Sequence, residues 1–71
     1  MAHNLNSKIG KRIRALRSEK GWSQVKMADL LGMNRGYLSE LETGKRDPSL
    51  SVLKTIADGL SISLSRLFDG L

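Results

Sequence analysis

The chain contains no cysteine, and it has only one proline, one tryptophan, one tyrosine and one phenylalanine among its 71 residues. Without cysteine, the fold is stabilised neither by disulfides nor by a thiolate metal centre. A chain of this length forms one domain with a small hydrophobic core. Close helix packing or dimerisation is therefore expected to supply the remaining stability.

Long apolar segments are also lacking, because no more than two apolar residues occur in a row. A transmembrane helix needs about 20 predominantly apolar residues, and a signal peptide needs an apolar stretch of roughly 7–15. The sequence therefore predicts a soluble, cytoplasmic protein that has no membrane partner.

Residues that carry catalytic chemistry are few. The single histidine, His3, has no second histidine or cysteine with which to share a metal ion. No nucleophile has a nearby base, and there is no His-Glu-x-x-His motif, carboxylate pair or glycine-rich phosphate loop. We therefore expect no enzyme activity, no cofactor and no metal.

Positive charge dominates, with a net charge of +5 and a pI of about 10.1. A pI above about 9 indicates an anionic partner such as nucleic acid. The excess lies entirely within residues 1–20, which carry six basic residues and one acidic residue. These side chains either form a solvated surface or lie near a phosphate backbone, and charge alone does not decide between the two.

Apolar spacing predicts a compact all-α domain of five helices over residues 7–71. Residues 1–6 show no periodicity and are expected to form a flexible tail. Asn6 or Ser7 is expected to cap a first helix that runs to about Lys20. Four more helices are predicted at 24–31, 35–43, 50–60 and 64–69, and each is preceded by a Ser or Asn that can cap it. No segment has the period of a β-strand.

Residues 23–44 predict two short helices joined by a tight turn at Gly32. Leu38 and Leu41 give the second of these helices a buried side. Its opposite side displays Arg35, Gly36, Ser39 and Glu40. A helix that presents polar side chains from its N-terminal half is typical of helix-turn-helix DNA recognition.

The same stretch resembles the phage-repressor (Cro/repressor) type of helix-turn-helix transcription factors. The resemblance is carried by Ser23-Gln24, Met27-Ala28, Gly32, Leu38-Ser39 and Leu41-Glu42-Thr43-Gly44. It implies a sequence-specific regulator that binds double-stranded DNA through helix 35–43. It also implies that Arg17 forms a buried structural ion pair with Glu42.

Candidate base contacts come from the exposed side of helix 35–43. Arg35 matches guanine O6 and N7 with its guanidinium fork, although a phosphate contact is the alternative. Gly36 either lets the backbone approach DNA closely or is a tolerated substitution. Ser39 and Glu40 come next along this side, and the Glu40 carboxylate could accept a hydrogen bond from cytosine N4.

Candidate phosphate contacts come from helix starts and from the loop after residue 43. Gln24 begins its helix, where backbone N–H groups and the side-chain amide can bind a phosphate together. A solvated loop remains the alternative for Lys45 and Arg46. The full predicted set is Ser23, Gln24, Asn34, Tyr37, Thr43, Lys45 and Arg46.

A candidate dimer surface lies at the C-terminus, where Leu64, Leu67, Phe68 and Leu71 recur at helical spacing. A small core cannot bury all four, so part of this stripe is expected to pair with a second copy. A homodimer would bind a near-palindromic operator. Phage regulator, restriction–modification controller and antitoxin remain open, as does a module that binds an unidentified protein partner.

Overall fold

The computed structural model describes residues 2–71, and the side chains of residues 4–71. It consists of five helices: α1 (Ala2–Glu19), α2 (Gln24–Leu31), α3 (Arg35–Glu42), α4 (Leu50–Gly59) and α5 (Leu64–Leu67). No strand occurs in this part of the chain. The predicted all-α architecture is therefore confirmed. Within the same residues, no helix has both the length and the apolar character needed to cross a membrane.

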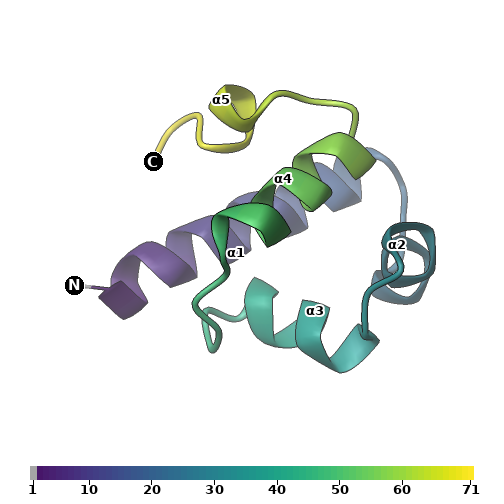
Figure 1. Ribbon diagram of the computed structural model, residues 1–71, viewed down its shortest axis with the longest axis horizontal. Helices are drawn as coiled ribbons and strands as arrows, with labels where there is room; N and C mark the ends of the chain where they lie inside the picture. The colour runs from purple at the N-terminus through teal and green to yellow at the C-terminus, as the bar shows by residue number, and fades with distance from the viewer. Residues whose placement is uncertain (1) are drawn as a thin grey trace.

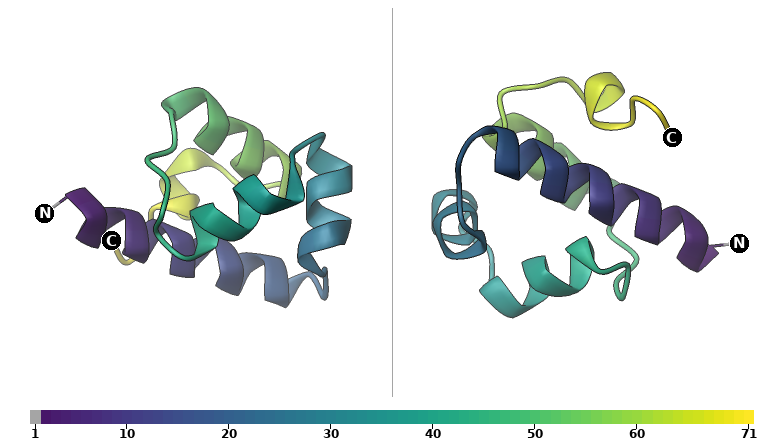
Figure 2. Two further views of the ribbon diagram at one scale, coloured as in Figure 1. Left: turned by 90° about the horizontal axis from the view of Figure 1, so that it is seen from below. Right: turned by 180° about the vertical axis from the view of Figure 1, so that it is seen from behind.

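The long helix α1 lies along one side of the molecule, and the other elements gather on its opposite side (Figure 1 and Figure 2). Helix α3 packs against α1, α2 packs against both α3 and α4, and α5 packs against α4. Figure 2 shows that α3 lies at one face of the molecule, so that one side of this helix is turned away from the other helices. The chain returns at its C-terminus toward the N-terminal end of α1 (Figure 1). The domain measures 31 × 24 × 21 Å.

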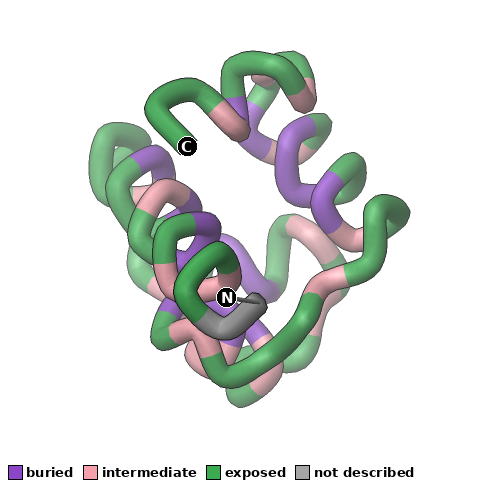
Figure 3. The backbone as a smooth tube through the Cα atoms, turned by 90° about the vertical axis from the view of Figure 1, so that its left-hand side faces the viewer, coloured by how far each residue is buried: buried purple, intermediate pink, exposed green. Residues whose placement is uncertain are grey.

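One hydrophobic core joins all five helices, and its purple segments face one another in Figure 3. Helix α1 contributes one apolar stripe, and α4 contributes another at helical spacing. The short helices supply the residues between these two stripes. The buried apolar residues are Ile9, Ile13, Leu16, Met27, Ala28, Leu38, Leu41, Leu53, Ile56, Ala57, Leu60 and Leu67.

The predicted caps of α2 to α5 are confirmed. Ser23 Oγ accepts a hydrogen bond from the backbone N–H of Lys26 at 3.0 Å, and Asn34 Oδ1 accepts one from Tyr37 at 3.0 Å. Ser49 and Ser63 cap α4 and α5 in the same way. Each bond satisfies a backbone donor that the helix itself leaves without a partner. Local chemistry thus determines where these helices begin.

Gly10 lies inside α1 at its crossing with α3. A Cβ atom at this position would lie 2.3 Å from the carbonyl oxygen of Leu41 and 2.6 Å from that of Glu42. Those backbone atoms cannot move aside as the end of a flexible side chain could. Gly10 therefore sets how closely α1 approaches the C-terminal end of α3.

The predicted start of the first helix at Asn6 or Ser7 is wrong, because α1 begins at Ala2. Leu5 lies four residues before Ile9 and so extends the same side of the helix by one turn. The prediction of a tail rests on the polar character and the missing periodicity of residues 1–6. Met1 lies outside the described residues, and the flexibility of residues 1–6 stays a prediction.

Helix α5 is only four residues long and ends at Leu67, earlier than predicted. A side chain of α1 holds it in place. Arg12 Nη2 donates to the carbonyl of Arg66 at 2.9 Å, and Arg12 Nε donates to that of Leu67 at 3.3 Å. These carbonyls belong to the end of a helix, and that of Arg66 also accepts from the backbone N–H of Asp69 at 3.1 Å.

Candidate nucleic-acid interface

The outward side of α3 carries the four predicted base-contacting residues. Arg35 and Gly36 are exposed at its first turn, and Ser39 and Glu40 follow as half-buried residues. The opposite side is fixed by Leu38 and Leu41, which lie in the core. The outward orientation of α3 is therefore a consequence of core packing.

Gly36 is not required by the interior of the protein. A Cβ atom there would meet only the side-chain oxygen of Asn34, at 3.1 Å. Its backbone is not in the left-handed region that favours glycine. No contact within the described residues therefore requires glycine at this position, and the two predictions, close approach of DNA and tolerated substitution, both stay open.

Arg17 and Glu42 form the ion pair that the resemblance implied. Arg17 Nε lies 2.7 Å from Glu42 Oε2, and Nη2 lies 2.9 Å from Oε1. The exposed fractions of the two side chains are only 11% and 2%. The hydrogen bond with Glu42 raises the pKa of the Arg17 guanidinium, against the lowering effect of burial. A third hydrogen bond, 2.7 Å long, runs from Arg17 Nη1 to the carbonyl of Trp22.

Gln24 takes part in the same network, which sequence analysis missed. Its amide Nε2 donates to Glu42 Oε1 at 3.0 Å, so the start of α2 is tied to the end of α3. Glu42 thereby receives donors from two other parts of the chain. The residues are 18 positions apart, and no local pattern indicates their contact. The predicted phosphate contact of Gln24 remains a prediction.

Arg46 folds back onto α3, which sequence analysis also missed. Its Nε donates to Glu40 Oε1 at 2.9 Å, and its guanidinium carbon lies 5.6 Å from the centre of the Tyr37 ring. We call Tyr37, Glu40 and Arg46 the Arg46 cluster. Glu40 therefore meets a cation of its own chain, although it was predicted to contact a base.

The remaining phosphate candidates lie at the N-termini of α2 and α3 and at or just after the C-terminus of α3. Thr43 caps its C-terminus, and its hydroxyl donates to the carbonyls of Ser39 and Glu40. Lys45 follows as an exposed side chain, whereas Ser23 and Asn34 use their side-chain oxygens as N-caps. Both capping oxygens act as acceptors, so the hydroxyl hydrogen of Ser23 and the amide Nδ2 of Asn34 can still donate to a phosphate.

The candidate dimer surface needs one correction. Leu67 is only 1% exposed and belongs to the core, because α5 turns this side chain toward α4 and α1. Leu64 and Phe68 are half-buried, and Leu71 is 42% exposed. Sequence analysis missed Leu5, which is 50% exposed. An apolar groove brings this end together, and it is lined mainly by Leu5, Ile9, Leu53, Phe68 and Leu71.

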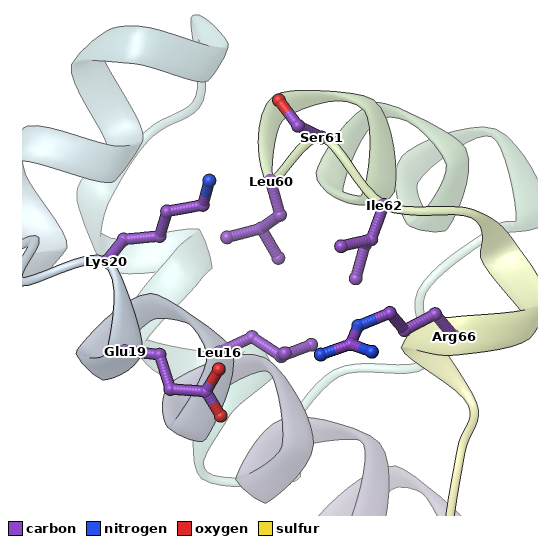
Figure 4. A pocket seen from close by; sticks show the side chains of 7 residues that line it. All are labelled: Leu16, Glu19, Lys20, Leu60, Ser61, Ile62 and Arg66. Atoms are coloured by element: carbon purple, nitrogen blue, oxygen red, sulfur yellow. The ribbon is translucent and has the colours of Figure 1, made fainter.

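A second pocket lies where the C-terminal end of α1 meets the link between α4 and α5 (Figure 4). Its apolar lining is formed by Leu16, Leu60 and Ile62. Its charged lining is formed by Glu19, Lys20 and Arg66. It holds no nucleophile paired with a base. Among the described residues, no group of three or more His, Cys, Asp or Glu side chains could hold a metal ion.

The fold and the outward side of α3 define a helix-turn-helix domain, with α2 and α3 as its two helices. A family model described as helix-turn-helix matches residues 13–67. The immunity repressor protein of Bacillus phage phi105 is 37% identical over 59 residues, which are 83% of this chain and 41% of the repressor. The chain thus spans about two fifths of that relative's length.

Two solved structures agree with this fold. The restriction–modification controller protein C.AhdI from Aeromonas hydrophila has a TM-score of 0.85 and 40% identity, covering 89% of this chain and 96% of that one. The master regulator for biofilm formation SinR, known from Bacillus subtilis, was crystallised in complex with DNA. It has a TM-score of 0.80 and 35% identity, covering 86% of this chain and 98% of that one.

The chain therefore belongs to the helix-turn-helix family of phage-repressor type transcriptional regulators. The predicted family is confirmed. The prediction that the chain is not an enzyme is confirmed too, because the family and these relatives are transcriptional regulators.

Proposed function

We propose that the protein is a sequence-specific regulator that binds a near-palindromic operator as a homodimer. In this proposal the outward side of α3 enters the major groove of double-stranded DNA. The observation that carries it is the exposure of Arg35 and Gly36 at the first turn of α3, opposite the buried Leu38 and Leu41. The SinR structure with DNA supports the same use of this fold.

Arg35 is the main base-contacting residue of the proposal. An arginine fork pairs with guanine O6 and N7 in the most common specific contact of the major groove. Gly36 follows directly and leaves room for the base edge or a thymine methyl group. Ser39 lies one turn further along the same side and can donate to or accept from a base.

Phosphates would hold the domain in register on both sides of α3. The proposed contacts use polar side chains and the N-terminal N–H groups of α2 and α3, which attract anions. Gln24 has a second amide hydrogen beyond the one it donates to Glu42, so it can bind a phosphate and keep its internal bond. The proposed set is Ser23, Gln24, Asn34, Tyr37, Thr43, Lys45 and Arg46.

Dimerisation would pair the groove at the N-terminal end of α1 with that of a second copy. Leu5 and Leu71 expose apolar surface beside it, and Phe68 is half-buried in its lining. A two-fold axis there would set two copies of α3 about 34 Å apart, one turn of DNA, so that they meet successive major grooves. The protein would then act in the cytoplasm, on the nucleoid when DNA-bound.

The test is selection from random-sequence duplexes by the purified protein at about 0.15 M salt, which is physiological ionic strength. Enrichment of a near-palindrome is expected, and Arg35→Ala should lose the selected half-site preference. Weak, salt-sensitive binding without any enriched sequence would contradict the proposal. The alternative would then be a protein-interaction module that uses the apolar groove, and Arg35→Ala would leave its partner bound.

A further inference from the structure

The loop after α3 is fastened to Glu40 by its backbone as well as by a side chain. The backbone N–H of Lys45 donates to the carbonyl of Glu40 at 2.9 Å, and Thr43 Oγ1 donates to the same carbonyl at 3.2 Å. Gly44 turns the chain here with a φ of +77°. Arg46 is thereby returned to the outward side of α3, within reach of the Glu40 carboxylate.

The Arg46 cluster gives this side chain two partners on α3 in the free protein. Glu40 accepts from Nε, and the ring of Tyr37 lies against the guanidinium. Tyr37 and Glu40 are three residues apart, so they lie on the same side of α3. The pairing uses one of the five N–H donors of the guanidinium, and no other hydrogen bond of Arg46 occurs within the described residues.

We propose that Glu40 is a positioning residue for Arg46 and does not contact a base. It orients the guanidinium so that the Nη donors meet an operator phosphate at the end of α3. The proposal rests on the proposed function, and it replaces the cytosine contact predicted for Glu40. It also explains how a carboxylate can lie on a DNA-binding surface, since Arg46 offsets its charge.

Two physical effects support this role. A long side chain that is already ordered loses less conformational freedom on binding. A guanidinium with a fixed plane can also bind phosphate through two parallel N–H···O bonds. In contrast, an exposed ion pair by itself adds little to stability. The effect of Glu40 is therefore expected in DNA binding and not in folding.

The experiment compares Glu40→Gln, Arg46→Gln and the double variant with the unchanged protein on the selected operator. Glu40→Gln should weaken binding by about 2- to 10-fold, the range expected when one more long side chain must be ordered on binding. This loss is expected although the net charge becomes more positive. Once Arg46 is replaced, the Glu40 change should no longer weaken binding, because the carboxylate then has no guanidinium to orient. Base preference should be the same in Glu40→Gln as in the parent.

Asp58→Asn is the matched control. It changes the net charge by the same amount and breaks another exposed ion pair, in which Lys54 Nζ lies 2.8 Å from Asp58 Oδ1 on α4. This variant should bind the operator as tightly as the parent or slightly more tightly. Equal or tighter binding by Glu40→Gln would overturn the proposal, and so would a relaxed preference at one base pair, which would restore Glu40 as a base-contacting residue.

A readout without DNA separates this proposal from the proposed function. In the free protein, the Arg46 Nε–H resonance should be protected from solvent exchange, and Glu40→Gln should remove that protection. If the parent protein selects no operator from random-sequence duplexes, the proposed function fails while the positioning of Arg46 by Glu40 can still stand. An Arg46 Nε–H that exchanges equally fast in parent and variant would overturn the positioning role alone.

Discussion

Arg17 binds both carboxylate oxygens of Glu42, with N···O distances of 2.7 and 2.9 Å, and so joins α1 to the last residue of α3. Gln24 and the carbonyl of Trp22 complete the network. No buried side-chain nitrogen or oxygen lacks a hydrogen-bond partner within the described residues. Core packing orients α3, and this buried ion pair fixes the C-terminal end of the helix to α1.

Glu42→Ala should destabilise the domain strongly. It leaves Arg17 charged and largely buried without its partner, and loss of one partner of a buried pair typically costs about 3–5 kcal/mol. For a domain of this size, each kcal/mol lowers the melting temperature by roughly 4–8 °C. Thermal unfolding followed by circular dichroism measures the effect. Asp58→Ala, which removes one partner of an exposed ion pair, is the control. A shift of only a degree or two in the melting temperature of Glu42→Ala would contradict a stabilising role for the buried pair.

The Arg17 contribution should be independent of pH across the neutral and moderately alkaline range. The pKa of Arg17 is raised in the folded state, chiefly by its hydrogen bond to Glu42. A raised folded pKa means that the stabilisation is complete below the unfolded pKa and is lost only as pH rises through the folded one. Urea unfolding of the parent and of Arg17→Gln between pH 7 and about 10, still below the ordinary pKa of arginine, should therefore give a constant difference in unfolding free energy.

Gly10→Ala should destabilise the domain, although alanine is the better helix former. Its Cβ would lie 2.3 Å from a backbone oxygen of α3, so the two helices must move apart. Such overpacking costs about 1–3 kcal/mol, more than the roughly 0.5–1 kcal/mol gained from helix propensity. Denaturant titration measures the difference. An unchanged or higher midpoint would mean that α1 and α3 approach less closely than described.

Gly36→Ala is expected to separate folding from DNA binding. The added Cβ meets only the flexible side chain of Asn34, at 3.1 Å, so stability should stay within about 1 kcal/mol of the parent. Operator affinity should fall, by about 10-fold, if the backbone approaches DNA closely at this position; that factor corresponds to roughly 1.4 kcal/mol. Fluorescence anisotropy with the selected duplex tests it, and full affinity would favour tolerated substitution.

Leu5→Glu should prevent dimer formation. A carboxylate at the apolar groove would have to be buried without a partner in the paired state. Sedimentation velocity should then report a monomer where the parent forms a dimer. Leu30→Glu makes the same change at a similarly exposed leucine of α2, 55% against 50% exposed, and should leave the dimer intact. Dissociation by both variants, or by neither, would remove the groove from the proposed interface.

Sequence alone determined that there are five helices, which residues cap α2 to α5, and the helix-turn-helix pattern, although it did not predict where α1 begins or where α5 ends. Each depends on residues within about four positions, as when Asn34 caps the turn that contains Tyr37. The spacing of Leu38 and Leu41 identified the buried side of α3, and therefore also the outward side opposite to it. Local hydrogen bonds and apolar periodicity sufficed for these features because neither needs a distant partner.

Tertiary structure decided which residues that are far apart in the sequence come into contact. It brought Gln24 to Glu42, returned Arg46 to Glu40, buried Leu67 and set Gly10 against the end of α3. These contacts depend on how α1, α3 and α5 cross, and crossing geometry is set by the packing of whole helix surfaces. The sequence could therefore name Glu40 as a residue of the exposed side, while only the fold revealed the cation that it meets.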